Sequence, residues 1–374
     1  MLAACLLDRL VGDPRSWLHP VQVIGWTIAL FRRRLEPLAC GRPWALRIVG
    51  LGITLVVVGL SAAAGWCLER WLLLSLSLGS GWGVPSVAAA AATLAPSESL
   101  GPGLLPGAIT LVALASALAG RSLEQAVEQV LRALPPAMEC PSVDPSADPG
   151  EEPLRSARQR LAWIVGRDTE GLDTAGILRA LAETASENAV DGLFAPLFWM
   201  LVGALLWQIP GAPGPLCLAW AFKAASTLDS MLGYRRGTLL WLGTAGARLD
   251  DILTWLPCRL VAFSLPLVAP HPDRCLTLTR RAFRQGAADP SPNSGVSQAI
   301  YALMLGLQLG GESLYAGQRR FKPVVGVSVG AAGAVSISAT AVRSILGLSR
   351  RLQLLWLLGS ALAVFVPCIT KTLI

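Results

Sequence analysis

Long uncharged stretches recur along this chain, separated by short segments rich in charge, glycine or proline. Residues 48–68 carry no charge and, as a helix, are long enough to cross about 30 Å of hydrocarbon. Residues 352–370 predict a final span of the same kind. Residues 71–97 and 99–120 are also uncharged, but both contain glycine and proline. Either one of them crosses while the other is short or re-entrant, or both cross.

Two further apolar stretches lie in the second half of the chain. Residues 192–222 carry no charge, and the proline- and glycine-rich segment 210–215 interrupts them. This pattern predicts a span, a tight turn and the start of a return helix. Residues 252–269 are apolar apart from Arg259 and contain Pro257. The chain is therefore predicted to be an all-α, polytopic integral membrane protein.

The pattern changes over residues 121–189. Apolar residues first recur there at helical spacing with charged residues between them, which predicts an amphipathic helix outside the bilayer. Residues 135–153 are rich in proline, serine and acid and predict a mobile loop. Asp173 or Thr174 is placed to cap the helix that follows. We expect one membrane-embedded domain, 1–374, with an extramembrane helical insertion at 121–189.

Composition narrows the class of protein. Hydrophobic residues make up 53% of the chain and charged residues only 15%, which excludes an ordinary soluble domain. The net charge of +7 comes largely from arginines that flank apolar stretches, as the positive-inside rule describes, so nucleic-acid binding is excluded. The eight cysteines form no C-x-x-C pair, and we expect no cleavable signal peptide because charged residues come too early for an apolar core of adequate length. We expect a multi-pass protein of the cell inner (plasma) membrane, with the lipid bilayer as its surroundings.

A row of carboxylates is the first candidate for chemistry. Glu183, Glu187 and Asp191 recur every four residues and share one face of a helix that runs into the apolar stretch at 192. Like charges at this spacing repel, so a cation is expected to neutralise them, and oxygen ligands suit Mg²⁺. The alternative is a solvated acidic face that leads into a membrane span.

Ionisable residues also lie near the ends of the apolar stretches. Lys223 and Asp229 follow the return helix, and Arg248, Asp250 and Asp251 precede the next apolar stretch. Charges at membrane depth are costly and usually face a partner or a wet cavity. They form either a functional site or, with Arg259, a structural network in which the charges neutralise one another.

Three loops complete the set of candidates. Gly-Asp-Pro at Asp13 and the nearby His19 predict an ordered loop, in which His19 is either functional or a local hydrogen-bonding group. Residues 289–295 contain two prolines, asparagine and glycine, which predict a rigid loop. Residues 308–315 predict a second glycine-bearing loop, a weak phosphate signal because no Walker-type lysine follows.

Five blocks of residues together resemble one known family, the CobD/CbiB family of cobalamin biosynthesis proteins. They are Gly12-Asp13-Pro14 with His19-Pro20-Val21; Glu183-x-x-Ser186-Glu187-Asn188-x-x-Asp191-Gly192 with Ala195-Pro196-Leu197-Phe198; Lys223-Ala224 with Thr227-Leu228-Asp229-Ser230 and Gly233-Tyr234; Ala247-Arg248-Leu249-Asp250-Asp251 with Pro257 and Arg259; and Ser291-Pro292-Asn293. The resemblance covers nearly the whole chain. It implies an integral-membrane adenosylcobinamide-phosphate synthase, which joins adenosylcobyric acid to aminopropanol or its phosphate through an amide and consumes ATP.

The resemblance also implies roles for particular residues. ATP and Mg²⁺ are the implied cofactors, the corrinoid is a substrate, and other late enzymes of the cobalamin pathway are candidate partners. No Cys-His or Ser-His-Asp set is evident, so direct transfer to the amine is expected. The expected roles are catalysis for Asp229, Lys223, Arg248 and His19; nucleotide binding for Asp13, Arg167, Ser291 and Asn293; and metal binding for Glu187, Asp191, Asp250 and Asp251.

The chain departs from the family pattern at several positions, three of which replace a polar or charged side chain. Asp289 stands where the family typically has histidine, Gln298 where it has glutamate, and Ser226 where it has asparagine. The functional alternatives to a ligase are a membrane transporter or sensor with buried charges and a non-catalytic scaffold of the cobalamin pathway.

Overall fold

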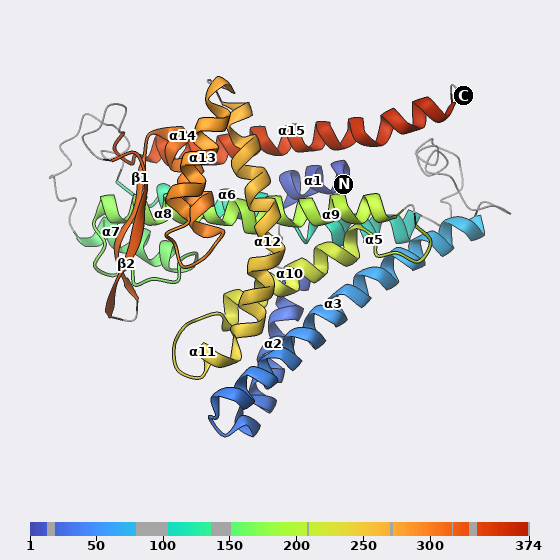
Figure 1. The fold of residues 1–374 in the computed structure, drawn as a ribbon, viewed down its shortest axis with the longest axis horizontal. Coiled ribbons are helices and arrows are strands. Elements are labelled where there is room, and N and C mark those ends of the chain that lie inside the picture. Colours follow the sequence, from blue (N-terminus) through green and yellow to red (C-terminus); the bar gives the residue numbers. More distant parts are fainter. Residues whose placement is uncertain are drawn as a thin grey trace. The chain divides into compact units, whose positions relative to one another are not determined.

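The structure is a computed structural model that describes residues 1–12, 19–79, 104–135, 151–207, 209–269, 272–315, 317–328 and 335–372. Helices dominate it (Figure 1), so the predicted all-α class is confirmed. The chain forms two compact units, each made of two separate segments. The first unit comprises Met1–Ala119 and Pro196–Asp250, and the second comprises Gly120–Ala195 and Asp251–Ile374.

The first unit is built around the long helix α3. Its elements are α1 (Leu2–Val11), α2 (Pro20–Leu35), η1 (Glu36–Ala39), α3 (Pro43–Gly79), α5 (Leu104–Ala115), most of α9 (Ala195–Leu206), α10 (Pro215–Leu232), α11 (Leu239–Leu242) and the start of α12 (Thr244–Ser264). Buried Ile28, Ile53 and Leu228 belong to one core cluster that α2, α3 and α10 share. At Gly65 a Cβ atom would lie 2.8 Å from Cys217 Cα, so the close approach of α3 and α10 requires glycine.

The second unit holds the remaining elements. They are α6 (Gly120–Leu131), α7 (Glu151–Ala162), α8 (Thr174–Ala189), the π-helical turn η3 (Val190–Phe194), the rest of α12, η4 (Leu265–Val268), η5 (Pro272–Arg274), α13 (Cys275–Gly286), α14 (Ser294–Leu305), β1 (Gln308–Tyr315), β2 (Gln318–Gly326) and α15 (Ala339–Thr372). Guanidinium–carboxylate pairs join α15 to α6, with Arg343 Nε 2.9 Å from Glu128 and Arg350 Nε 2.5 Å from Glu124.

A β-hairpin replaces the loop predicted at residues 308–315. β1 and β2 pair antiparallel, with Gly311 opposite Lys322 and an irregularity between Leu309 and Gly311. Gly310 and Gly311 adopt φ values of 90° and 89°, which side chains with a Cβ rarely tolerate. The glycine pair that predicted a loop is therefore a bulge inside a strand.

Three helices are long and apolar enough to cross a membrane. They are Pro43–Ser77, Thr174–Leu206 and Thr244–Val268, and a fourth span is counted if Leu104–Ala115 and Gly120–Leu131, bent by 44°, act as one. The first confirms the predicted span at 48–68. α15 covers the predicted final span, but its side chains beyond residue 361 lie outside the described part.

Two other predicted segments are only partly covered by the structure. Most of the predicted span at 71–97 and most of the predicted loop at 135–153 lie outside the described residues. The helix that carries the three carboxylates was predicted to lie outside the bilayer. It is continuous with the next apolar helix, since Thr174–Leu206 forms one candidate span.

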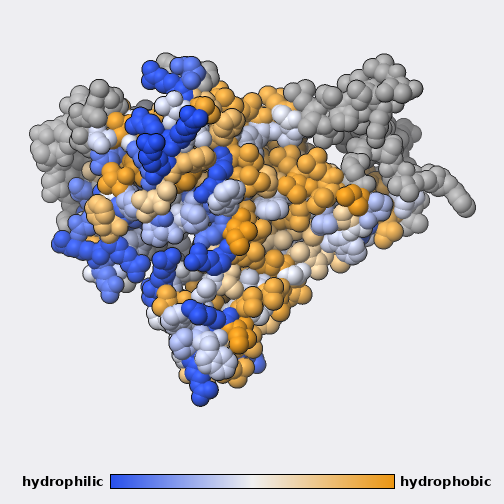
Figure 2. Space-filling model, viewed as in Figure 1, coloured by the Kyte–Doolittle hydropathy of each residue, from blue (hydrophilic) through white to orange (hydrophobic). Residues whose placement is uncertain are grey.

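The exposed surface agrees with a lipid environment. On α3, Ile48, Leu55 and Leu74 are each more than half exposed, at 62%, 64% and 62%. Figure 2 shows hydrophobic side chains gathered over a broad part of the visible face, while hydrophilic ones gather elsewhere. Patches of that extent are rare on soluble monomers and mark surfaces that another phase or partner covers.

A buried carboxylate in α3 holds the start of α10. Glu69 is 2% exposed, and its side chain accepts hydrogen bonds from the backbone N–H groups of Gly214 at 3.1 Å and Leu216 at 2.5 Å. The neighbouring Arg70 donates to the carbonyl of Ala212 at 2.7 Å. These bonds satisfy N–H groups that open a helix and place a negative charge at the positive end of its dipole. Glu69, an ionisable residue within a candidate span, thus has structural partners at the start of α10.

We expect Glu69→Gln to lower the thermal unfolding midpoint of the purified protein. The amide keeps one acceptor oxygen but turns an N–H₂ group toward backbone donors and removes the charge, a loss of about 1.5–3 kcal/mol for hydrogen bonds to a charged group. The matched control is Glu36→Gln, since Glu36 is a carboxylate of the same unit with side-chain partners. Equal melting temperatures for the wild type and Glu69→Gln would contradict the capping role.

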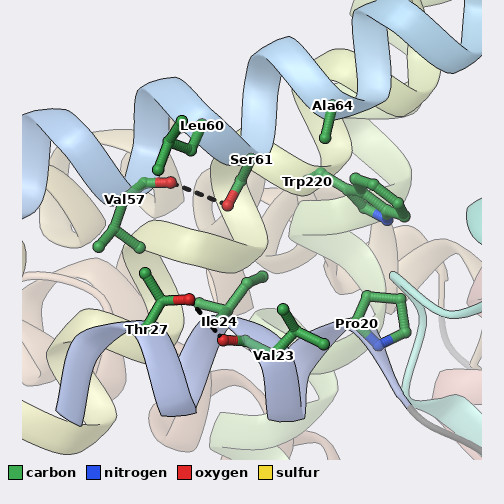
Figure 3. A pocket seen from close by; sticks show the side chains of 9 residues that line it. All are labelled: Pro20, Val23, Ile24, Thr27, Val57, Leu60, Ser61, Ala64 and Trp220. Atoms are coloured by element: carbon green, nitrogen blue, oxygen red, sulfur yellow. Dashed lines mark hydrogen bonds between the residues drawn. The ribbon is translucent and has the colours of Figure 1, made fainter. Parts of the chain in front are cut away.

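A largely apolar pocket of about 390 Å³ lies between α2, α3 and α10 (Figure 3). Its two hydroxyl groups bond within their own helices: Ser61 donates to the carbonyl of Val57, and Thr27 to that of Val23, each at 2.8 Å. Trp220 in its lining donates to the carbonyl of Ala113 at 3.2 Å. The pocket therefore presents no uncommitted polar hydrogen from these three side chains. None of the predicted site residues lines it.

Candidate functional site

The first carboxylate of the predicted row is buried and paired with a protein cation. Glu183 is 1% exposed, and its Oε2 accepts a hydrogen bond from Nη2 of Arg167. Its Oε1 accepts the backbone N–H of Gly310 at 2.8 Å, and Nη1 of Arg167 donates to Ser313 Oγ at 3.0 Å. The hydrogen bonds of Glu183 to Gly310 and of Arg167 to Ser313 connect this ion pair to β1. Arg167, predicted to bind nucleotide, has protein partners here, and its nucleotide role stays a prediction.

The second carboxylate, Glu187, faces α14. Its Oε2 accepts a hydrogen bond from Gln298 Nε2 at 3.0 Å, and the same amide donates to Ser294 Oγ at 3.1 Å. One residue earlier in each helix, Ser297 Oγ donates to the carbonyl of Ser186 at 3.0 Å. Gln298, one of the departures from the family pattern, therefore fixes the carboxylate of Glu187. A glutamate at this position would place two carboxylates side by side instead.

The third carboxylate departs from the predicted regular spacing. Asp191 belongs to the π-helical turn Val190–Phe194, which interrupts the α-helical geometry between α8 and α9. Isolated π turns widen a helix by one residue per turn and are frequent at functional sites. The side chain of Asp191 is half-buried. The three carboxylates thus occupy three different environments and do not form a uniform row.

Lys322 on β2 is the residue that the sequence reasoning missed. It is half-buried, and among the described residues it forms no hydrogen bond or ion pair within 4 Å. Burial alone would lower the pKa of its ammonium, but Glu187, Tyr315, Glu183 and Asp289 act against this and raise the pKa above its usual value. Lys322 therefore stays protonated at neutral pH. The raised pKa favours the charged form of Lys322, which suits a fixed cation better than a general base at neutral pH.

The sign of the linkage follows from the raised pKa. A lysine whose pKa is raised on folding contributes stability that is fully present below the unfolded value of about 10.4 and is lost as pH rises through the folded value. Lys322 therefore gives the protein no pH-dependent stability between pH 6 and about 9.

The loop before α14 is held by its own side chains and by α12. Asp289 Oδ1 accepts the N–H of Ser291 at 2.8 Å, and Ser291 Oγ accepts the N–H of Ser294 at 3.3 Å. Asn293 is 6% exposed; its Oδ1 accepts from Arg259 Nη1 at 2.5 Å, and its Nδ2 donates to the carbonyl of Asp251 at 2.9 Å. The amide of Asn293 therefore has structural partners, and the predicted nucleotide contacts of Ser291 and Asn293 stay predictions.

Glycine permits this loop to lie close to α13. A Cβ atom on Gly295 would lie 2.5 Å from the carbonyl oxygen of Gly286 and from Asp289 Cβ. No real side chain tolerates such a distance, so the junction of α13 and α14 requires glycine.

At the start of α12, Arg259 has partners other than carboxylates, and the alternative of a charge-neutralising network with Asp250 and Asp251 stays a prediction. Arg259 donates to Asn293 and to the carbonyl of Pro292, and its guanidinium stacks over Trp255 at 4.6 Å. Among the described residues, neither Arg248 nor Arg259 forms an ion pair with a carboxylate. The guanidinium of Arg259 is therefore satisfied by the carbonyl of Pro292 and by the side-chain amide oxygen of Asn293.

The other predicted catalytic residues lie in the first unit. His19 is the N-cap of α2, where its Nδ1 accepts the N–H of Val21 at 3.3 Å, so the local hydrogen-bonding interpretation has geometric support. Lys223 and Asp229 lie on α10, six residues and about 120° apart around the helix axis. A Cβ atom on Gly233 would lie 2.1 Å from Asp229 Oδ1, so this glycine leaves room for the carboxylate. Asp13 lies outside the described residues.

The described residues offer only a small set of ligands for the predicted Mg²⁺ site. Within the described ranges, no three His, Cys, Asp or Glu side chains lie close enough together to hold a metal ion by themselves. Mg²⁺ bound with nucleotide usually takes only one or two carboxylates, the rest of its shell being phosphate oxygens and water. Glu187 and Asp191 fit that limited role. Asp250 and Asp251 are half-buried on α12, and their metal role stays a prediction.

Comparisons with known proteins agree along the whole chain. A model of the family described as "CobD/Cbib protein" matches residues 1–344. The chain is 37% identical to cobalamin biosynthesis protein CobD of Klebsiella pneumoniae, over 98% of this chain and 96% of that protein. It is 37% identical to CobD of Synechocystis sp., over 86% and 80%, and 36% identical to cobalamin biosynthesis protein CbiB of Salmonella typhi, over 98% and 96%. No solved structure matches the chain.

These matches extend across both compact units and include all the blocks on which the resemblance rested. The chain therefore belongs to the CobD/CbiB family.

Proposed function

We propose that this protein acts in cobalamin biosynthesis as an adenosylcobinamide-phosphate synthase of the cell inner membrane. It joins the carboxylate of adenosylcobyric acid to the amine of aminopropanol or of its O-phosphate, with ATP consumed. The observation that carries the proposal is the match of residues 1–344 to the family model, together with relatives named as cobalamin biosynthesis proteins over nearly their full length. The membrane location is supported by the three helices of spanning length.

The second unit offers groups suited to this reaction. A carboxylate is a poor electrophile, and ATP bound with Mg²⁺ would supply the activation that makes one oxygen a leaving group. Lys322 offers a fixed positive charge for phosphate or carboxylate oxygens, and Glu187 and Asp191 offer oxygen ligands for the metal. Gln298 holds Glu187 in place through a 3.0 Å hydrogen bond. The roles of His19, Lys223, Asp229 and Arg248 are proposed from the family resemblance alone.

The direct test uses purified full-length protein in nanodiscs. It is incubated with adenosylcobyric acid, ATP and Mg²⁺ and with either aminopropanol or aminopropanol phosphate, and the corrinoid products are separated by chromatography. We expect an amide product that requires ATP. A protein that folds and binds the corrinoid without forming product would instead support a transporter, a sensor or a scaffold.

Glu187→Gln is expected to lower turnover by at least tenfold while the protein stays folded. The substitution removes one negative charge at nearly constant shape, so the Mg²⁺ concentration required for half-maximal activity should rise. Glu170→Gln is the matched control because Glu170 is an exposed carboxylate before α8. Unchanged turnover and unchanged Mg²⁺ dependence would show that Glu187 is only a structural partner of Gln298.

A further inference from the structure

Two hydrogen bonds attach helix α13 to the last turn of α12, which belongs to a candidate membrane span. Thr279 Oγ1 donates to the carbonyl of Ala262 at 3.0 Å, and Cys275 Sγ donates to that of Phe263 at 3.1 Å. Both carbonyls lie in the last turn of α12, within the candidate span Thr244–Val268. Because a span ends at the bilayer surface, this attachment would place α13 close to the level of the lipid headgroups.

The exposed side of α13 is basic. Arg280, Arg281 and Arg284 are exposed, and Arg274 directly precedes the helix. Nowhere in the described ranges do these four guanidinium groups have an ion pair or a side-chain hydrogen bond. By contrast, Arg343 and Arg350 of the same unit each pair with a glutamate. Among the described residues, no side chain therefore neutralises the charge of α13.

Apolar side chains share this exposed surface with the arginines. Leu276 is 53% exposed and Phe283 is 37% exposed, whereas Thr279 and Ala282 are buried. Arg280 and Arg284 lie one helical turn apart, and Leu276 lies one turn before Arg280, so the three share a side. A helix with arginine beside exposed leucine and phenylalanine is typical of segments that lie in the membrane interface.

We propose that α13 is an interfacial helix that binds anionic phospholipid headgroups through Arg280 and Arg284, assisted by Arg274 and Arg281. Guanidinium groups bind phosphate oxygens through paired, charge-assisted hydrogen bonds. Leu276 and Phe283 would enter the boundary between headgroups and acyl chains. A soluble anion offers no apolar phase in which these two side chains could be buried. A phospholipid bilayer supplies both the phosphate and the apolar phase at the level where α12 ends.

The test compares lipids that differ only in headgroup charge. Full-length protein in neutral detergent is titrated with phosphatidylglycerol or phosphatidylcholine, and its thermal unfolding midpoint is followed. Each arginine near an anionic surface contributes about 1 kcal/mol, so Arg280→Gln with Arg284→Gln should weaken the apparent affinity for phosphatidylglycerol about 30-fold. The response to phosphatidylcholine should stay the same. Raised salt should weaken the preference of the wild type for phosphatidylglycerol.

The matched control is Arg319→Gln with Arg320→Gln, which removes the same charge from exposed positions of the β-hairpin. This variant should keep the wild-type affinity for phosphatidylglycerol within about twofold. Should the α13 double variant fail to fold, each single substitution is expected to weaken the affinity about fivefold. Arg280→Lys with Arg284→Lys keeps the charge and should retain most of the preference.

Two results would overturn the proposal. In the first, Arg280→Gln with Arg284→Gln responds to phosphatidylglycerol as the wild type does. In the second, inorganic phosphate or ATP in phosphatidylcholine micelles raises the unfolding midpoint as much as phosphatidylglycerol does, and this response is lost with Arg280 and Arg284. The second result would assign α13 to a soluble anion.

Discussion

Replacing Arg167 with alanine is expected to destabilise the protein by about 3–5 kcal/mol, because it leaves a buried carboxylate without its counter-charge. Glu183 is 1% exposed, and its remaining partner would be the backbone N–H of Gly310. The hairpin would also lose the contact of Arg167 with Ser313. Thermal or denaturant unfolding of the purified protein measures the loss.

The exposed pair Arg319–Glu312 on the same hairpin is the control. Its nitrogen and oxygen lie 3.2 Å apart with side chains 81% and 55% exposed, so Arg319→Ala should change stability little. Combining Arg167→Met with Glu183→Gln removes both charges and should recover much of the lost stability. If Arg167→Ala leaves the unfolding midpoint unchanged but abolishes turnover, Arg167 binds nucleotide as its sequence position predicted, and the structural assignment is wrong.

Lys322→Met is expected to reduce turnover about 10²–10³-fold while the protein stays folded, because a fixed charge that faces developing negative charge contributes on this scale. The expectation rests on the proposed ligase function. Lys322 is suited to the role because it is half-buried and its raised pKa keeps it charged at neutral pH. Turnover of the nanodisc-embedded variant, measured beside its unfolding midpoint, separates catalysis from folding.

The matched control is Arg320→Met, which also removes a cation from β2 but from an exposed side chain stacked over Tyr315 at 5.6 Å. Lys322→Arg keeps the charge and should restore part of the activity. A Lys322→Met protein that melts early but turns over normally in its folded fraction would make Lys322 a structural counter-ion of Glu187 and Glu183. If neither the wild type nor any variant forms the amide product, the result would count against the ligase proposal itself.

Part of the candidate site was visible in the sequence. The spacing of Glu183, Glu187 and Asp191 predicted a cation beside these carboxylates, with Mg²⁺ as the expected one, and that metal site stays a prediction. Arg167 pairs with Glu183, and Lys322 lies within electrostatic reach of Glu183 and Glu187. Lys322 could not be predicted as a neighbour of these carboxylates, since it lies in a segment without a helical or phosphate-binding pattern. A lysine opposite a glycine bulge becomes recognisable as a site residue only when the strand register is known.

The sequence by itself determined the class of protein, its main spans and its family, because these depend on local properties. Charge-free length, helical periodicity and short motifs are read within one segment. Only the tertiary structure decided which charges meet. Glu183 bonds to Gly310 across 127 residues, and Gln298 bonds to Glu187 across 111. Such pairs arise when the burial of apolar faces brings distant segments together, and no pattern within either segment encodes the partner.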